Sequence, residues 1–133
     1  MIQAQELRIN NLLKRADDSV FSVGANDIKI ISEWNNPFAP LPEPIPLTEE
    51  WLVKFGFIAD NYGVFYKTKD CSNNSNSIID LWAKKCLVEQ FDISIGQEFG
   101  DTHNLCFIKY VHQLQNIYFA LTGEELTEKK VNP

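Results

Sequence analysis

The most strongly patterned stretch of the chain covers residues 110–123 and reads YVHQLQNIYFALTG. Its apolar residues recur three and four positions apart, which is the repeat of one face of an α-helix. They are Val111, Leu114, Ile117, Tyr118 and Leu121. Gly123 is the residue type that most often follows the end of a helix. The pattern therefore predicts an amphipathic helix from about Tyr110 to Thr122.

A second, shorter helix is predicted over residues 49–55. Thr48 offers a hydroxyl that can cap the first turn, and two glutamates follow it, where negative charge favours the start of a helix. Gly56 then supplies the stop. The expected apolar side of this helix consists of Trp51, Leu52 and Phe55.

Apolar and polar residues alternate in several other segments, as they do in half-buried strands. We expect strands at 7–10, 20–23, 28–30, 62–67, 78–84, 87–95 and 105–109, with a helix of one or two turns as the alternative at 78–84 and a loop over 96–103. The first three strands predict an antiparallel meander or small half-barrel. The whole pattern predicts an α+β fold: one domain over 1–126, with a frayed or disordered tail over 127–133.

Between the first strands and the short helix lies a proline-rich segment, residues 35–46. Five prolines exclude a helix or a central strand there, because proline fixes φ and lacks a backbone donor. We expect an extended connector that is fixed to the core by Phe38, Leu41 and Ile45; an SH3-type partner ligand is the alternative. The small polar residues at 72–76 predict a loop between two strands.

Composition excludes several functional classes. The chain has 133 residues and a net charge of −6, and its basic residues are scattered, so we expect no nucleic-acid binding. No apolar run approaches the roughly 20 residues of a membrane span, and the N-terminus lacks a signal peptide pattern. The three cysteines, Cys71, Cys86 and Cys106, fit free thiols. We therefore expect a cytoplasmic protein with no membrane contact.

We find no motif for catalysis. The glycines form no phosphate-binding loop, and the spacing of His103 and Cys106, even with the other two cysteines, is unlike that of known zinc sites. A dyad of Cys106 or Cys86 with His112 or His103 has the residue types for nucleophilic catalysis, but nothing nearby in sequence would activate the thiol. We expect no catalytic residue, no metal and no cofactor, and the residues favour a non-enzymatic protein.

The helix at 110–122 carries neutral hydrogen-bonding side chains where charged ones are usual. Neutral amides lose less on desolvation than charges, so this face can pack on another element or on a partner. Packing within the fold is the favoured interpretation, and the partner site is the alternative. The candidate binding residues are Tyr110, His112, Gln113, Gln115, Asn116 and Trp82.

Two segments, PIPLTEEWLVKFGF at 44–57 and YVHQLQNIYFALTGEEL at 110–126, resemble the signatures of a family of short bacterial and bacteriophage proteins that has no assigned activity. Members often open with a Leu-Arg-Ile-Gly-Asn-like strand. Residues 7–11 here read LRINN, with Asn10 in place of that glycine. The resemblance implies a phage or mobile-element accessory setting and carries over no catalytic residue.

Three functions compete on this basis. The leading hypothesis is a non-enzymatic accessory protein that binds another protein, or itself, through the last helix or the proline connector. The alternative is a binder or hydrolase of small nucleotide-type ligands, such as an anti-defence protein, which would need a deep pocket lined by Trp82, Tyr110 or His112. An acidic mimic of nucleic acid would need its carboxylates gathered on one face.

Overall fold

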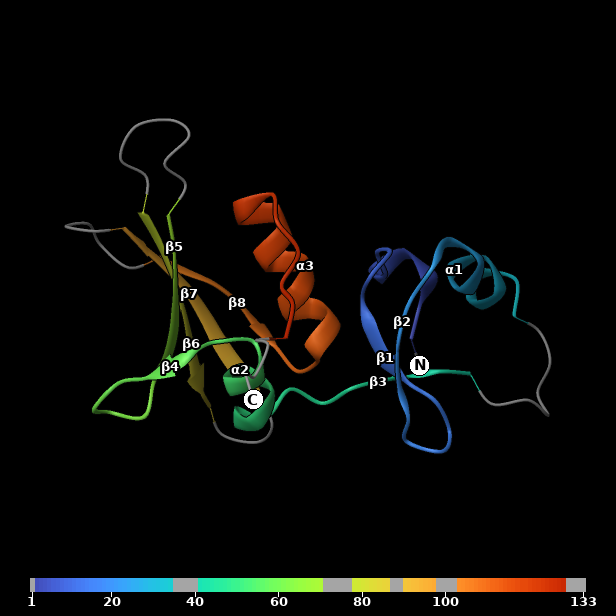
Figure 1. The fold of residues 1–133 in the computed structure, drawn as a ribbon, viewed down its shortest axis with the longest axis horizontal. Helices are drawn as coiled ribbons and strands as arrows, with labels where there is room; N and C mark the ends of the chain where they lie inside the picture. The colour runs from blue at the N-terminus through green and yellow to red at the C-terminus, as the bar shows by residue number, and fades with distance from the viewer. Residues whose placement is uncertain (1, 35–40, 71–77, 87–89, 98–102, 129–133) are drawn as a thin grey trace, which may run out of the picture.

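The computed structural model describes residues 2–34, 41–70, 78–86, 90–97 and 103–128. Within these ranges the chain forms two antiparallel sheets and three α-helices, which confirms the predicted α+β class. Figure 1 shows a small N-terminal unit at one end, a larger sheet at the other, and the last helix between them.

The N-terminal unit has its own sheet and its own core. Its elements are the 3-10 helix η1 (Ala4–Glu6), the strands β1 (Leu12–Lys14), β2 (Val20–Ser22) and β3 (Glu43–Pro44), and the helix α1 (Ala25–Ser32). The strand order is β2-β1-β3, with all pairs antiparallel. The buried residues of this small core are Ile2, Leu7, Leu13, Val23 and Ile31.

Two of the predicted N-terminal strands are wrong. Residues 28–30 lie in α1, where the Asp27 carboxylate accepts a hydrogen bond from the Gly24 amide at 2.8 Å and so satisfies a donor of the first turn. Residues 7–10 lie in the chain between η1 and β1 and end in a turn. Asn10 has a φ of +79° there, in the left-handed region that glycine and, less often, asparagine adopt. The strand expected at 20–23 is confirmed as β2.

The second sheet has five strands in the order β4-β5-β6-β7-β8. They are β4 (Ile58–Ala59), β5 (Phe65–Asp70), β6 (Ile78–Lys85), β7 (Phe91–Gln97) and β8 (His103–Ile108). The segment at 78–84 is therefore a strand. The loop expected over 96–103 is too long at both ends, because Gly96 and Gln97 extend β7 and His103 begins β8; residues 98–102, like 87–89, lie outside the described ranges.

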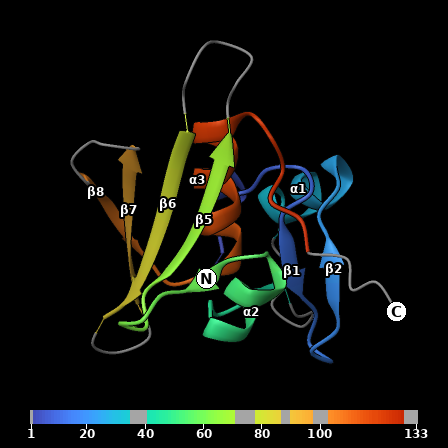
Figure 2. The same cartoon turned by 60° about the vertical axis from the view of Figure 1, so that its left-hand side comes forward.

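Both predicted helices are confirmed. The short one is α2 (Glu49–Lys54), and the Thr48 hydroxyl accepts a hydrogen bond from the Trp51 amide at 3.4 Å at its start. The last one is α3 (Val111–Thr122), and it ends at Gly123, which has a left-handed φ of +75°. Figure 2 shows that both helices lie on the same side of the five-stranded sheet.

The sheet consequently has a covered face and an open face. The pairing register aligns Ala59, Phe65, Ala83, Ile93 and Cys106 in one row across the strands, and Phe65, Ala83 and Ile93 of this row are buried against the core that α2 and α3 complete. The neighbouring row lies on the opposite face, because side chains alternate along a strand. It consists of Ile58, Tyr66, Trp82, Ser94 and Asn104.

The proline-rich connector joins the two units as an extended segment over the residues that the structure describes. Pro44 belongs to β3 at an edge of the small sheet, which is where a strand tolerates proline. Ile45 is buried in the larger core, and Leu41 packs against the smaller one, as expected for a connector fixed to its own fold. Residues 35–40, with Phe38, lie outside the described ranges, as do the loop at 72–76 and residues 129–133 of the tail.

Candidate functional site

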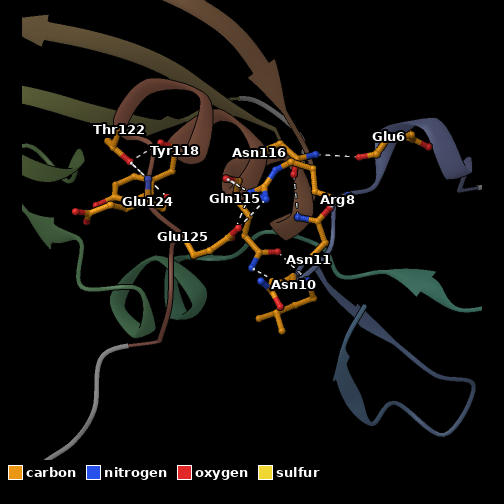
Figure 3. A network of polar contacts seen from close by, with 11 residues as sticks. Glu6, Arg8, Asn10, Asn11, Gln115, Asn116, Tyr118, Thr122, Glu124 and Glu125 are labelled. Atoms are coloured by element: carbon orange, nitrogen blue, oxygen red, sulfur yellow. Dashed lines mark hydrogen bonds and ion pairs between the residues drawn. The ribbon is translucent and has the colours of Figure 1, made fainter. Parts of the chain in front are cut away.

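Two of the predicted amide residues of α3, Gln115 and Asn116, face the N-terminal unit. We call this contact the seam. It joins Glu6, Arg8, Asn10, Asn11 and Leu12 on one side to His112, Gln115, Asn116, Phe119 and Glu125 on the other, and Figure 3 shows its hydrogen-bonding residues. The two sides are more than 100 residues apart in the chain.

Two amides form the centre of the seam. Gln115 is buried, its Oε1 accepts a hydrogen bond from the Leu12 backbone amide at 2.8 Å, and its Nε2 donates to the Asn10 carbonyl at 3.4 Å. Asn116 accepts from Asn11 Nδ2 at 2.8 Å and donates to the Glu6 carbonyl at 2.9 Å. These side chains therefore bond to three backbone groups and one side chain of the N-terminal unit, so they are packed within the fold.

Arg8 closes the seam at the C-terminal end of α3. Its guanidinium donates to both carboxylate oxygens of Glu125, at 2.9 and 3.2 Å, and to the Gln115 carbonyl at 3.3 Å. It also lies 4.2 Å from the centre of the Phe119 ring. A bidentate pair combined with a cation–π contact uses the planar shape of arginine, which lysine lacks.

His112 lies at the other end of the seam and is buried. Neither of its ring nitrogens has a hydrogen-bond partner among the described residues, and its Nε2 is 3.7 Å from Glu6 Oε2. Burial lowers the pKa of His112, and the Glu6 carboxylate offsets that effect only in part. The Tyr110 ring stacks on the imidazole with a centroid distance of 5.9 Å.

The other two predicted site residues lie elsewhere. Gln113 Oε1 accepts hydrogen bonds from the backbone amides of Lys109 and Tyr110, so it caps the start of α3. Trp82 lies on the open face of the sheet, where its ring is 4.9 Å from that of Tyr66. The structure thus brings together His112, Gln115 and Asn116 but separates them from Trp82.

The open face carries apolar residues that the sequence analysis did not single out. Ile58 is 59% exposed and Phe107 is 62% exposed, although both belong to strands. Phe107 pairs with Asp92, which alternates with Ser94, so it shares the open face; Leu105 is two residues away along β8 and 43% exposed. The sequence signal for these residues was the strand alternation, but their exposure depends on which face the helices cover.

A pocket of about 290 Å³ opens beside the seam. Its lining residues are Asn10, Leu12, Ser22, Gln115, Glu125, Leu126, Thr127 and Glu128. It contains none of Trp82, Tyr110 and His112, the residues that the ligand-binding alternative required. Gln115 is the one predicted site residue that lines it.

The described residues hold no group of three or more His, Cys, Asp or Glu side chains that could bind a metal. The pKa of the Cys106 thiol is raised, first by burial and then by Asp92, whereas a nucleophilic thiol needs a lowered pKa. Among the helices of the described ranges, none is long and apolar enough to cross a membrane.

The fold and the seam define an α+β protein with two packed units joined by a polar contact. Comparison with known proteins adds no family to that description. No family model, no curated protein and no solved structure matches this chain.

Proposed function

We propose that this is a non-catalytic accessory protein that binds another protein through the open face of its five-stranded sheet. The observation that carries the proposal is the set of apolar and aromatic side chains on that face, namely Ile58, Tyr66, Trp82 and Phe107. Exposed apolar residues gathered on one face of a protein often mark an interaction surface.

The composition of the face supports a protein partner. Thr68 and Asp80 hydrogen bond to each other at 2.7 Å, as do Ser94 and Asn104, so the polar side chains between the apolar ones are partly satisfied before any partner arrives. Lys84 and Asp92 are cross-strand neighbours of opposite charge. Aromatic anchors surrounded by mixed polar groups are typical of protein interfaces.

The amide face of α3, the surface first expected to bind, is a poorer candidate because the seam occupies it. The amide face instead holds the N-terminal unit in place.

The phage or mobile-element setting rests on the family resemblance of segments 44–57 and 110–126. A cytoplasmic location rests on the free thiols of Cys86 and Cys106, which fit a reducing compartment.

Affinity capture from bacterial host lysate tests the proposal. The immobilised chain is compared with Ile58→Lys and Trp82→Ala, which alter the open face, and with Val53→Lys, which places the same charge on α2 at a residue that is 56% exposed. We expect a protein that is retained by the wild type and by Val53→Lys but lost from the other two columns. Retention that is equal on all four columns, or no specific retention, would reject the proposal.

A second candidate function, the binding of a small nucleotide-type ligand, has support from the pocket beside the seam. Its volume of about 290 Å³ lies near the lower limit of ligand sites, and Asn10, Ser22 and Thr127 supply amide and hydroxyl groups. Mononucleotides should then raise the Tm of the wild type and of Ser32→Trp, in which the new ring lies on exposed α1. Mononucleotides should leave the Tm of Ser22→Trp unchanged, because the new tryptophan ring fills the pocket. No shift in the wild type would remove this candidate.

A further inference from the structure

Strand β8 is an edge of the five-stranded sheet. It pairs with β7 on one side, and the structure places no other described strand on its second side. Backbone pairing resumes just after β8, where the Lys109 carbonyl accepts from Leu47 at 2.8 Å and Val111 donates to Ile45 at 2.9 Å. Among the described residues, the stretch without a second strand partner is therefore β8 itself, His103–Ile108.

The composition of β8 leaves this edge without the usual protection. Edge strands of natural proteins commonly carry lysine, another charged residue or proline, which discourage pairing with a second strand. The sequence of β8 is HNLCFI, which contains none of these. A bulge opposite Ile93 and Ser94 interrupts the pairing with β7, and a bulge can itself protect an edge. Here, however, the extra residue is Leu105, an exposed apolar side chain close to Phe107.

We infer that β8 pairs with β8 of a second copy of this chain, antiparallel and about a two-fold axis, so that the two sheets become one. This inference rests on the proposed function, protein binding, and names one partner. A second copy fits because β8 is uncharged: two identical strands can align without opposing like charges, although each chain carries a net charge of −6. Leu105 and Phe107, the exposed apolar side chains of β8, then lie at the junction in both copies.

The two-fold axis predicts a register. Full overlap of the six residues of β8 places the axis between Leu105 and Cys106, so that Asn104 of one copy lies opposite Phe107 of the other. Cys106 of each copy then lies opposite Leu105 of the other, which places the two Cys106 Cα atoms roughly 6 Å apart for a strand spacing of about 4.8 Å and a rise of about 3.4 Å per residue. Because the net charges of the two chains repel each other at long range, added salt should strengthen the dimer.

Sedimentation equilibrium of the purified full chain, from low micromolar to submillimolar concentration, tests the inference without any host partner. We expect a dimer for the wild type and for Val53→Lys. Phe107→Lys should raise the dissociation constant by about tenfold or more, since it places a lysine on each of the two paired β8 strands and so adds charge to both edges that must meet. Leu105→Lys is the second variant, and circular dichroism checks that both remain folded.

Cross-linking tests the register. In a chain with Cys71→Ser and Cys86→Ser, a short bismaleimide should join two copies through Cys106, and adding Cys106→Ser should abolish the product. A wild-type chain that stays monomeric at every concentration, or a dimer that survives both lysine variants, would overturn the inference. Either result would leave the capture experiment with Ile58→Lys able to decide the proposed function separately.

Discussion

Arg8 and Glu125 are 117 residues apart in the chain, yet their side chains form two parallel hydrogen bonds of 2.9 and 3.2 Å across the seam. The pair is about three-quarters covered and lies against the Phe119 ring. It joins the N-terminal unit to the segment that follows α3. Polar contacts such as this one join the two units, beside the apolar contact that Leu12 makes with the larger core.

Arg8→Lys should lower the free energy of unfolding by about 1 kcal/mol, because lysine keeps the charge but loses the bidentate geometry and the stacking. Arg8→Ala should lower the free energy of unfolding by more than Arg8→Lys does. Lys14→Ala is the matched control, since Lys14 makes only long ion pairs of 3.6 and 3.8 Å to exposed carboxylates. Urea denaturation measures all three variants, and equal losses for Arg8→Lys and Lys14→Ala would contradict the importance of the pair.

Gln115→Ala should lower the free energy of unfolding by about 2–3 kcal/mol, since it removes a buried side chain and leaves the Leu12 amide without its acceptor. Gln113→Ala is the comparison on the same helix. It removes a cap at the start of α3, and we expect a loss of about 1 kcal/mol. Thermal or urea unfolding of the two variants gives the difference. A smaller loss for Gln115→Ala than for Gln113→Ala would mean that the seam amides are dispensable.

His112 predicts a specific dependence of stability on pH. Its pKa in the folded protein is lowered, so the unfolded chain binds the proton more readily, and stability should fall as the pH drops below about 6.5, the ordinary histidine value. His112→Leu should remove this part of the pH dependence, whereas His103→Gln, at an exposed position, should keep it. The measurement is the free energy of unfolding at pH 7.5 and 5.5. Identical pH dependence in the wild type and His112→Leu would refute the assignment.

Asn10 adopts a left-handed conformation with a φ of +79°. Asn10→Gly should therefore be neutral or stabilising by a few tenths of a kcal/mol, while Asn10→Val should cost about 1–2 kcal/mol because a β-branched residue is strained there. Equilibrium unfolding compares the two. If valine were tolerated as well as glycine, the turn before β1 would not have this conformation in solution.

Local patterns predicted the helices α2 and α3 well but missed the strands β1, β3 and β4. The bounds of α3 and α2 follow from apolar spacing, the Thr48 cap and the two glycines, all of which act within a few residues. Residues 28–30 were wrongly predicted as a strand because alternating isoleucines resemble one. The signals for α1 were the Asp27 cap and the spacing of Ile28 and Ile31, the second of which is buried. A cap and an i, i+3 pair are weak signals in eight residues.

The seam could be predicted only in part. The neutral character of Gln115 and Asn116 indicated a contact, and packing within the fold was the favoured interpretation. Their partners, Leu12 and Asn11, could not be found from the sequence, because the pairing joins segments more than 100 residues apart and depends on how two units dock. The exposure of Ile58 and Phe107 could not be predicted either, since alternation defines two faces of a strand but does not show which face the helices cover.

The central claim is that the amides of α3 hold the N-terminal unit, which leaves binding to the open face of the sheet. A double-mutant cycle on Asn11 and Asn116, whose side chains meet at 2.8 Å, tests it most directly. Unfolding free energies of Asn11→Ala, Asn116→Ala and the double variant should give a coupling energy of about 1 kcal/mol. Losses that simply add would show that the two residues do not interact in solution, and would contradict the claim.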